Sequence, residues 1–242
     1  MARINDVAKL AGVSTATVSR ALSGKDSVSD QARQKVIAAA RELGYVASSS
    51  AYTLATGRYP MWYKDSTDLS LELCQSRATS TRAPGAPGAP AYMCTLLPEP
   101  GIYDDALPLV FPDNWPPEMF WFLAETTIAD NAAGYGVDAY VAGIEAAFAS
   151  ENPADGDQQS FARIRIRVNV PVAGTYTITH PYGVETVNVT APGRRAINIT
   201  RDIGIGAPGN FSGAVDGAIG PFLRSVNGPY TEVNPDTGAS ET

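Results

Sequence analysis

Apolar residues near the start of the chain recur at the spacing of short α-helices. The first set falls on one helical face and comprises Ile4, Val7, Leu10 and Ala11. Gly12 follows, where a tight turn needs a permissive backbone, and Ser14 stands at an N-cap position before a second predicted helix over 15–22. After Ser29 a third helix is predicted, ending at Gly44, with a stripe of Ala32, Val36, Ala39, Ala40 and Leu43. Two short helices joined by a glycine turn indicate a helix-turn-helix.

Two segments in the middle of the chain also carry apolar residues at helical spacing. The segment 116–132 begins with proline and has Met119, Phe120, Leu123, Ala124 and Ile128 at that spacing. The segment 137–148 repeats the pattern with Val137, Tyr140, Val141, Ile144, Ala147 and Phe148. We therefore expect two further helices there.

After Asp157 the pattern changes to a period of two, which is typical of β-strands. Residues 161–170 alternate between isoleucine or valine and mostly arginine, which predicts a half-buried strand with a basic outer face. Residues 174–179 and 184–190 flank a His-Pro-Tyr-Gly turn and predict a hairpin. Further strands are expected at 195–200 and 70–74, and the proline-rich segment 75–90 is expected to be an exposed loop.

These patterns predict an α+β protein. A three-helix helix-turn-helix headpiece precedes a mainly antiparallel, β-sandwich-like domain with two helices. The expected parts are the headpiece (1–46), a hinge or linker (47–60), an α+β domain with a β-sandwich-like C-terminal part (61–230) and a polar tail (231–242). A hydrophobic content of 44% with 18% charged residues is ordinary for a globular protein, so disorder is not expected.

Charge is unevenly distributed along the chain. The segment up to Arg58 has eight basic and four acidic side chains and a net charge of +4, whereas the whole chain carries −7. The remainder therefore carries −11. A cationic head on an acidic body favours a polyanionic partner at one end only.

The sequence also bears on the compartment and on the redox state of the cysteines. No stretch approaches the roughly 20 apolar residues that cross a bilayer, and the N-terminus lacks a signal-peptide pattern. We therefore expect a cytoplasmic protein with no membrane partner. Cys74 and Cys94 flank the proline-rich segment, and two alternatives stay open: a disulfide in an oxidising compartment, or two thiols in a reducing cytoplasm.

The N-terminal residues resemble the DNA-binding headpiece and hinge of the lactose-repressor (LacI/GalR) family. The resemblance runs in order through 4–22, Val28-Ser29, Arg33, Lys35-Val36, Ala39-Ala40, 42–45 and 54–58. It covers about a quarter of the chain. It implies that the second helix lies in the major groove of double-stranded DNA, where each base pair presents a distinct pattern of donors, acceptors and methyl groups.

Site residues follow from this resemblance position by position. Thr15 and Ala16 correspond to base-reading positions, and Arg20 corresponds to a long donor that reaches guanine O6 and N7. Positions that hold phosphates match Ser14, Thr17, Ser19, Ser23 and Ser29. Residues 48–56 match a hinge helix whose leucine wedge enters the minor groove, and that wedge is Leu54. The alternative, purely structural roles are helix capping for the serines and threonines, and anchoring of a linker for Leu54.

The chain departs from the family pattern at and after the hinge. Ala47, Ser48 and Tyr52 replace the proline, asparagine and arginine common there, in the segment that the resemblance assigns to the minor groove. Family members continue into two α/β lobes that bind an effector and form the dimer. The residues after Arg58 are too few for two such lobes and do not begin with a buried Ile/Val strand. The sequence therefore identifies no effector.

Catalytic, cofactor and metal patterns are weak. His180 is the sole histidine and is expected in a turn, so no catalytic triad is predicted. The glycines of 204–209 match a dinucleotide pattern in letters, but Pro208 opposes the helix that should follow. Asp155 and Asp157 are expected in a solvated turn rather than a calcium loop. We expect no enzyme activity, no cofactor and no metal site.

Two functions remain in competition. The first is a sequence-specific transcriptional regulator that reads an operator half-site with Thr15, Ala16 and Arg20. It lacks the usual sugar-binding core and acts as a homodimer. The second is a structural or binding β-sandwich protein, with a cell-surface role among the options, that carries a fused or chimeric headpiece. Its support is the abrupt change of pattern at Tyr59 and the paired cysteines.

Overall fold

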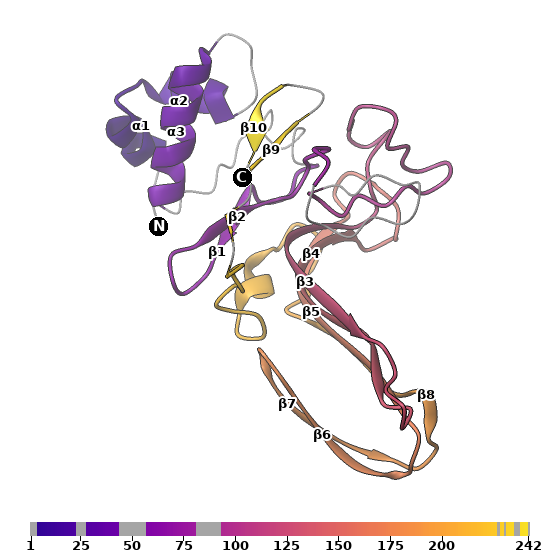
Figure 1. Cartoon of the computed structure of the whole chain (residues 1–242). Helices are drawn as coiled ribbons and strands as arrows, with labels where there is room; N and C mark the ends of the chain where they lie inside the picture. The colour runs from indigo at the N-terminus through magenta and orange to yellow at the C-terminus, as the bar shows by residue number, and fades with distance from the viewer. Residues whose placement is uncertain are drawn as a thin grey trace.

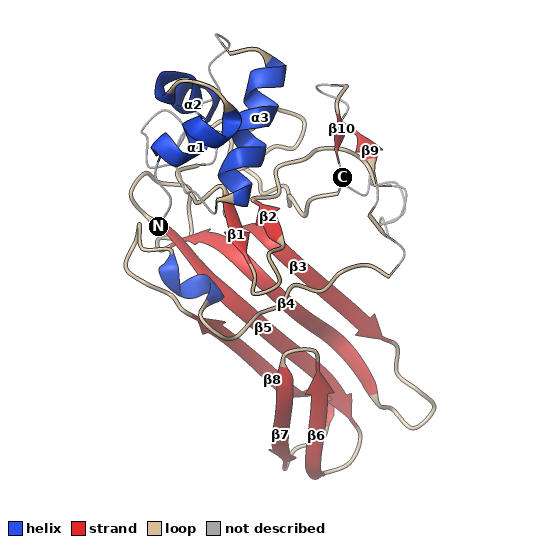
Figure 2. Ribbon diagram, turned by 90° about the vertical axis from the view of Figure 1, so that its left-hand side faces the viewer, coloured by secondary structure: helices blue, strands red, loops and turns tan. Residues whose placement is uncertain are grey.

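The computed structural model describes residues 4–22, 28–43, 57–80, 93–226, 228–229, 231–234 and 238–241. Three helices come first: α1 (Ile4–Ala11), α2 (Thr15–Leu22) and α3 (Asp30–Glu42). We call these helices the headpiece and the described residues from Gly57 onward the body. The body is built mainly of β-strands, and the headpiece lies at the end of the molecule that carries the short β1–β2 hairpin (Figures 1 and 2). The predicted headpiece and the α+β fold class are confirmed.

Short-range signals explain why the headpiece forms. Gly12 has a φ of +67°, and the Val13 N–H donates to the Ala8 carbonyl oxygen at 3.0 Å, which closes the end of α1. Apolar faces of all three helices then share one cluster, whose fully buried members are Val7, Val18, Val36 and Ala40. A glycine turn and three amphipathic faces therefore suffice to produce this unit.

The body is organised around one four-stranded antiparallel sheet in the order β3-β4-β5-β8. Its strands are β3 (Met119–Ile128), β4 (Gly136–Phe148), β5 (Gln158–Val170) and β8 (Gly193–Ile203). Three two-stranded hairpins accompany it: β1 (Trp62–Lys64) with β2 (Ser70–Glu72), β6 (Gly174–His180) with β7 (Gly183–Val189), and β9 (Glu232–Val233) with β10 (Ser240–Glu241). A short 3-10 helix, η1, spans Ser212–Val215. All strand pairs assigned to these elements are antiparallel.

One face of the sheet packs against the body's hydrophobic core. Alternate residues of β4 point into it, namely Tyr140, Ala142, Ile144, Ala146 and Phe148. Aromatic side chains from loops before the sheet and after β8 cover this face, with Trp115 and Phe222 among them. The β6–β7 hairpin supplies the second layer toward the far end, where Val189 packs with Val170 and Ile197 (Figure 1). In place of the second sheet of a sandwich, loops and the β6–β7 hairpin therefore cover the core face of the four-stranded sheet.

The prediction of two helices at 116–132 and 137–148 was wrong, because these segments form β3 and β4. Both contain residues at helical spacing, but β4 also alternates, with Tyr140, Ala142 and Ile144 on its core face. Five consecutive residues from Ala142 to Ala146 are buried because β4 is an inner strand that is covered on both faces. A strand buried on both sides loses the clean alternation by which strands are recognised.

The remaining strand predictions were confirmed with small changes at the ends. Residues 161–170 lie in β5, 174–179 and 184–190 form the β6–β7 hairpin, and 195–200 lie in β8. The prediction that His180 lies in the turn was wrong, because His180 is the last residue of β6 and pairs with Gly183; its Nδ1 lies 3.1 Å from the Tyr140 hydroxyl. Residues 204–209 form a loop, and Asp155 lies in a turn, as predicted. Residues 81–90 of the predicted exposed loop lie outside the described residues.

Strand β1 lies between the two hydrophobic cores. Trp62 is buried in the same cluster as Val36 and Ala40 of the headpiece, with Met61 packed beside it. Tyr63 points to the other side, where its hydroxyl lies 2.6 Å from the Ser160 Oγ and donates to the Phe211 carbonyl oxygen at 2.7 Å. Successive strand residues face opposite ways, so adjacent side chains join the headpiece to the body.

Cys74 and Cys94 are joined by a disulfide across a sequence separation of 20 residues. The bond lies next to the sheet, because the Cys74 N–H donates to the Phe120 carbonyl oxygen at 2.9 Å. Cys94 is buried, and its Sγ accepts from the Ser76 N–H at 3.0 Å. Of the two alternatives left open by the sequence, the structure contains the disulfide.

A buried ion network crosses the outer face of the sheet. Glu145 has no exposed surface, and the Arg163 Nη1 lies 2.9 Å from each of its carboxylate oxygens. Arg163 also binds Asp202, with Nε to Oδ1 at 2.7 Å and Nη2 to Oδ2 at 3.0 Å. Burial, together with the nearby Glu118, raises the pKa of Glu145 to about 8, although Arg163 opposes that rise.

This raised pKa predicts a pH-dependent stability. The folded state holds the Glu145 proton more tightly than the unfolded chain, so the stabilisation is complete below the ordinary pKa and is lost as pH rises through about 8. We expect the urea midpoint of the unmodified chain to fall, relative to that of Glu145→Gln, as the pH is raised across this range. Comparing the two proteins cancels the titration of every other group. Parallel pH profiles would contradict the assignment.

Candidate nucleic-acid interface

The start of α2 is held by Ser14. Its Oγ accepts a hydrogen bond from the Thr17 N–H at 3.1 Å and lies 2.9 Å from the Thr17 Oγ1. The Val18 N–H donates to the Ser14 carbonyl oxygen at 2.9 Å. Ser14 therefore acts as the N-cap, as its sequence position indicated. Only one hydroxyl hydrogen is used between Ser14 and Thr17, so the other can donate outward, to a phosphate for example.

The faces of α2 separate core residues from accessible ones. Val18 and Ala21 are buried in the headpiece core, whereas Thr15, Ala16 and Arg20 are exposed. Ser19 is half-buried. The three predicted base-reading side chains thus lie on the part of the helix that packing leaves accessible. Their contact with DNA stays a prediction.

Helix α3 supports α2 from behind. The Arg33 Nη1 donates to the Ala21 carbonyl oxygen at 2.8 Å, which places a cation at the C-terminal turn of α2, where the helix dipole favours it. The sequence had matched Arg33 to the family without assigning it this role. Ser29 is exposed and caps α3, because its Oγ accepts from the Ala32 N–H at 3.4 Å. Its own hydrogen remains available for a phosphate contact.

Two of the predicted DNA-contacting residues lie outside the part of the chain that the structure describes. Ser23 and Leu54, together with the predicted hinge helix over 48–56, lie outside the described residues. The described chain resumes at Gly57, whose carbonyl oxygen accepts from Gln158 Nε2 at 2.9 Å. The Pro60 carbonyl oxygen accepts from Trp121 Nε1 at 2.9 Å. The segment that follows the hinge is therefore fastened to the body's sheet.

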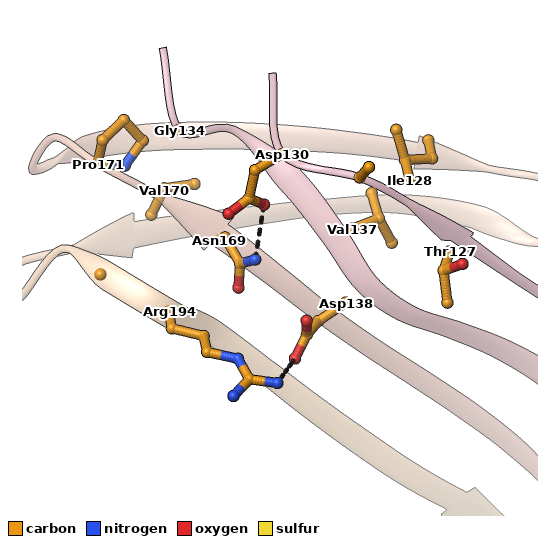
Figure 3. Close-up of a pocket in the computed structure, with 12 residues that line it drawn as sticks. Thr127, Ile128, Asp130, Gly134, Val137, Asp138, Asn169, Val170, Pro171 and Arg194 are labelled. Carbon is orange, nitrogen blue, oxygen red and sulfur yellow. Dashed lines mark hydrogen bonds and ion pairs between the residues drawn. The ribbon is translucent and has the colours of Figure 1, made fainter. Parts of the chain in front are cut away.

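A hollow of about 590 Å³ lies at the far end of the sheet (Figure 3). Its carboxylates already have partners: the Asp130 Oδ1 accepts from Asn169 Nδ2 at 2.8 Å, and the Asp138 Oδ2 is 3.2 Å from Arg194 Nη2. The hydrogen bond from Arg195 lowers the pKa of Asp138. Asp130 thus joins the loop after β3 to Asn169 of β5, and Asp138 joins β4 to Arg194 of β8. In the described part of the chain, no helix is long and apolar enough to span a membrane.

Comparison with known proteins identifies the headpiece alone. Residues 3–48 match the model of bacterial regulatory proteins of the lacI family. Over 55 residues the chain is 54% identical to the HTH-type transcriptional regulator GntR of Pseudomonas aeruginosa, a match that covers 23% of this chain and 16% of that protein. The sucrose operon repressor of Pediococcus pentosaceus is 50% identical over 52 residues, covering 22% of this chain and 16% of the repressor.

The ribose operon repressor of Haemophilus influenzae is 46% identical over 54 residues, with the same coverage of 22% and 16%. The chain thus spans only about a sixth of the length of these relatives. No solved structure matches the chain significantly. Three helices, a glycine turn and an exposed α2 face agree with the family match. Residues 3–48 are therefore similar to the helix-turn-helix headpiece of the lacI family of bacterial regulatory proteins, and in the described part of this range the structure contains the helices α1, α2 and α3.

Proposed function

We propose that the chain is a sequence-specific transcriptional regulator that reads an operator half-site with α2 in the major groove. The observation that carries this proposal is the exposure of Thr15, Ala16 and Arg20 on one helix whose other side is buried. Arg20 would read guanine through O6 and N7, and the Ala16 methyl would contact a thymine methyl. The repressor names of the relatives support a role in repression.

The surrounding hydroxyl groups would set the register on DNA. Ser14, Thr17, Ser19 and Ser29 lie in or beside α2 and at the start of α3, and hydroxyl contacts to phosphates position a protein without reading sequence. Ser23 and Leu54 are assigned by resemblance alone, Leu54 as a wedge in the minor groove. Double-stranded DNA as the partner makes a cytoplasmic location part of this proposal.

We further propose that regulation does not use the family's sugar-binding core. Supporting this, the body's strand pairs are antiparallel, whereas a doubly wound α/β lobe needs a parallel sheet. Two headpieces on a palindromic operator bind far more tightly than one, so the active form is a homodimer with its interface in the body.

The substitution Arg20→Ala tests the reading of bases. We expect it to weaken binding to the selected operator by about 1 to 3 kcal/mol and to relax preference at one base position. Operator sequences would first be selected from a random duplex pool, and affinities then measured at fixed salt concentration. Ser19→Ala is the matched control, because loss of a phosphate contact weakens all duplexes alike. Equal loss on operator and random duplex for Arg20→Ala would refute its role.

A second function is favoured by the disulfide. Disulfides persist in oxidising compartments, where a DNA-binding headpiece has no target, so the Cys74–Cys94 bond supports a structural or binding protein with a fused headpiece. A full-length chain that is monomeric and binds operator no more tightly than random duplex would favour this alternative. A dimer with selective binding would favour the regulator.

A further inference from the structure

Two arginines lie next to each other on the outer face of the sheet. Arg165 and Arg167 are two residues apart on β5, which places their side chains on the same face, about 6.7 Å apart along the strand. This face is opposite to the hydrophobic core, because Ile164 and Ile166, which alternate with the arginines, are buried in that core. Side chains as long as arginine can converge on one bound group from these two positions.

Neither guanidinium group has a partner in the part of the chain that the structure describes. The Nε atoms of Arg165 and Arg167 are shielded from solvent and make no hydrogen bond. Their terminal nitrogens are not shielded in this way, and both side chains are only half-buried, so an approaching anion can reach them. A half-buried cation without a hydrogen-bond acceptor is unfavourable, and an acceptor from a ligand would therefore stabilise both groups.

The other arginines of the four-stranded sheet are all neutralised. Each of them pairs with a carboxylate: Arg163 with Asp202, Arg194 and Arg195 with Asp138, and Arg201 with Glu185. A shortage of carboxylates does not explain the exception, since acidic side chains outnumber basic ones in the chain after Arg58. The two unpaired arginines therefore point to an anion that comes from outside the chain.

Further hydrogen-bond donors lie beside the two arginines. Strand β5 runs between β4 and β8 (Figure 2). On β8 the residues in register with the arginines are Thr200 and Asn198, and both are exposed. A hydroxyl group and a side-chain amide can donate to the same anion as a guanidinium group. On β4 the corresponding residues are Val141 and Ala139, whose side chains carry no acceptor that could occupy the arginines.

The carboxylates on this face do not pair with the two arginines. Asp202 lies opposite Arg163, whose Nε and Nη2 donate to its two oxygens at 2.7 and 3.0 Å. Glu125 of β3 is in register with Val141 of β4, so its backbone is two strands away from Arg165, a separation of about 10 Å. An anion bound between β5 and β8 would thus meet two positive charges at closer range than these carboxylates.

A phosphate group fits this set of donors better than a carboxylate. A phosphate monoester presents three acceptor oxygens and carries a charge of about −1.5 to −2 at neutral pH. A carboxylate has two oxygens and a single charge. Guanidinium groups bind phosphate through paired, charge-assisted hydrogen bonds. Two guanidinium groups, a hydroxyl group and an amide therefore match a phosphate dianion both in charge and in the number of donors.

We propose that Arg165 and Arg167 form a binding site for the phosphate dianion of a small molecule, with Thr200 and Asn198 as further donors. The site lies on the body, and it does not depend on the proposed reading of DNA by the headpiece.

Three probes test the chemistry of the site. Phenyl phosphate is the dianion, benzoate carries the same ring with a single charge, and inorganic phosphate lacks the ring. Each is titrated calorimetrically into the full chain at fixed ionic strength and at about pH 8, where the monoester is a dianion. We expect phenyl phosphate to bind about tenfold more tightly than benzoate.

Equal or tighter binding of benzoate overturns the proposal, as does the absence of saturable binding of phenyl phosphate at millimolar concentration. Inorganic phosphate that binds as tightly as phenyl phosphate would support the phosphate site and identify the free ion as its ligand. Weaker binding of inorganic phosphate would support the site and identify a phosphorylated organic molecule.

Variants locate the site. Arg167→Gln should weaken phenyl phosphate binding about tenfold. Arg224→Gln is the matched control, because it removes the same charge from an exposed arginine outside the sheet and should leave binding unchanged. Thr200→Asp keeps both arginines and places a carboxylate opposite Arg165, so it should abolish binding even if Arg167→Gln does not fold. Unchanged affinity in either folded site variant overturns the proposal.

DNA is the other possible source of phosphate groups, and a separate measurement distinguishes it. The double variant Arg165→Gln/Arg167→Gln should bind the selected operator as tightly as the unmodified chain. Loss of operator affinity in this variant, but not in Arg224→Gln, would mean that the two arginines contact the DNA backbone, which overturns the small-molecule site. Arg20→Ala should bind phenyl phosphate normally, so failure of the DNA assignment and failure of this one are distinguishable.

Discussion

Replacing Trp62 by alanine should lower the free energy of unfolding of the headpiece by about 3 to 5 kcal/mol. Trp62 is only 4% exposed and belongs to the same buried cluster as Val36 and Ala40, although it comes from the first strand of the body. Its removal leaves a cavity in a core made of small side chains, and three short helices cannot close such a cavity without shifting. The loss is measured by thermal or urea unfolding followed by helical circular dichroism.

The same substitution should weaken DNA binding, because α2, the helix that we propose reads the operator, packs on that core through Val18 and Ala21. Tyr63→Phe is the control: it keeps both clusters filled and removes a hydroxyl that bonds Ser160 and the Phe211 carbonyl oxygen. It should cost the body about 1 kcal/mol and leave the headpiece transition where it was. A headpiece transition that does not move in Trp62→Ala would show that the helices fold without β1.

Reduction of the Cys74–Cys94 bond is expected to destabilise the body by about 3 kcal/mol. The bond closes a loop with a sequence separation of 20 residues, so opening it restores conformational freedom to the unfolded chain. Cys74 also bonds through its N–H to the Phe120 carbonyl oxygen, so the loop is fastened to the first strand of the sheet. The measurement is denaturant unfolding with and without a dithiol reductant.

The double variant Cys74→Ser/Cys94→Ser should unfold early in both conditions and show no response to the reductant. Identical unfolding of the unmodified chain with and without reductant would indicate that the bond adds no stability. Trapping of free thiols in the protein from its native cells bears on function as well. A predominantly reduced pair agrees with the cytoplasmic regulator, and a predominantly bonded pair agrees with the alternative.

Features that are stabilised by residues close in sequence could be predicted from the sequence, and features that depend on distant residues could not. The Gly12 turn and the Ser14 cap involve residues within a few positions of one another, so their patterns were visible and correct. The β6–β7 hairpin is also local, and it was predicted from its alternation. By contrast, β4 was mistaken for a helix, since both of its faces are buried, and its core face packs against residues distant in sequence such as Tyr63 and Phe222.

The candidate site also has features that the sequence predicts and features that only packing produces. The exposure of Thr15, Ala16 and Arg20 follows from helical periodicity once Val18 is assigned to the core, so resemblance and pattern were enough. The bond from Arg33 to the Ala21 carbonyl oxygen depends on how α3 packs against α2, and no spacing rule reveals it. The buried ion pair of Glu145 with Arg163 was equally hidden, because the two residues come from different strands.

By itself, the sequence determined the described part of the headpiece: three helices, the N-caps Ser14 and Ser29, the glycine turn and the exposed face of α2. Tertiary structure alone decided that 119–128 and 136–148 are strands, that Trp62 belongs to the headpiece core and that Cys74 is bonded to Cys94. The physical reason is that helices and turns are stabilised by neighbours along the chain. Inner strands, shared cores and cross-links are stabilised by partners that only folding brings together.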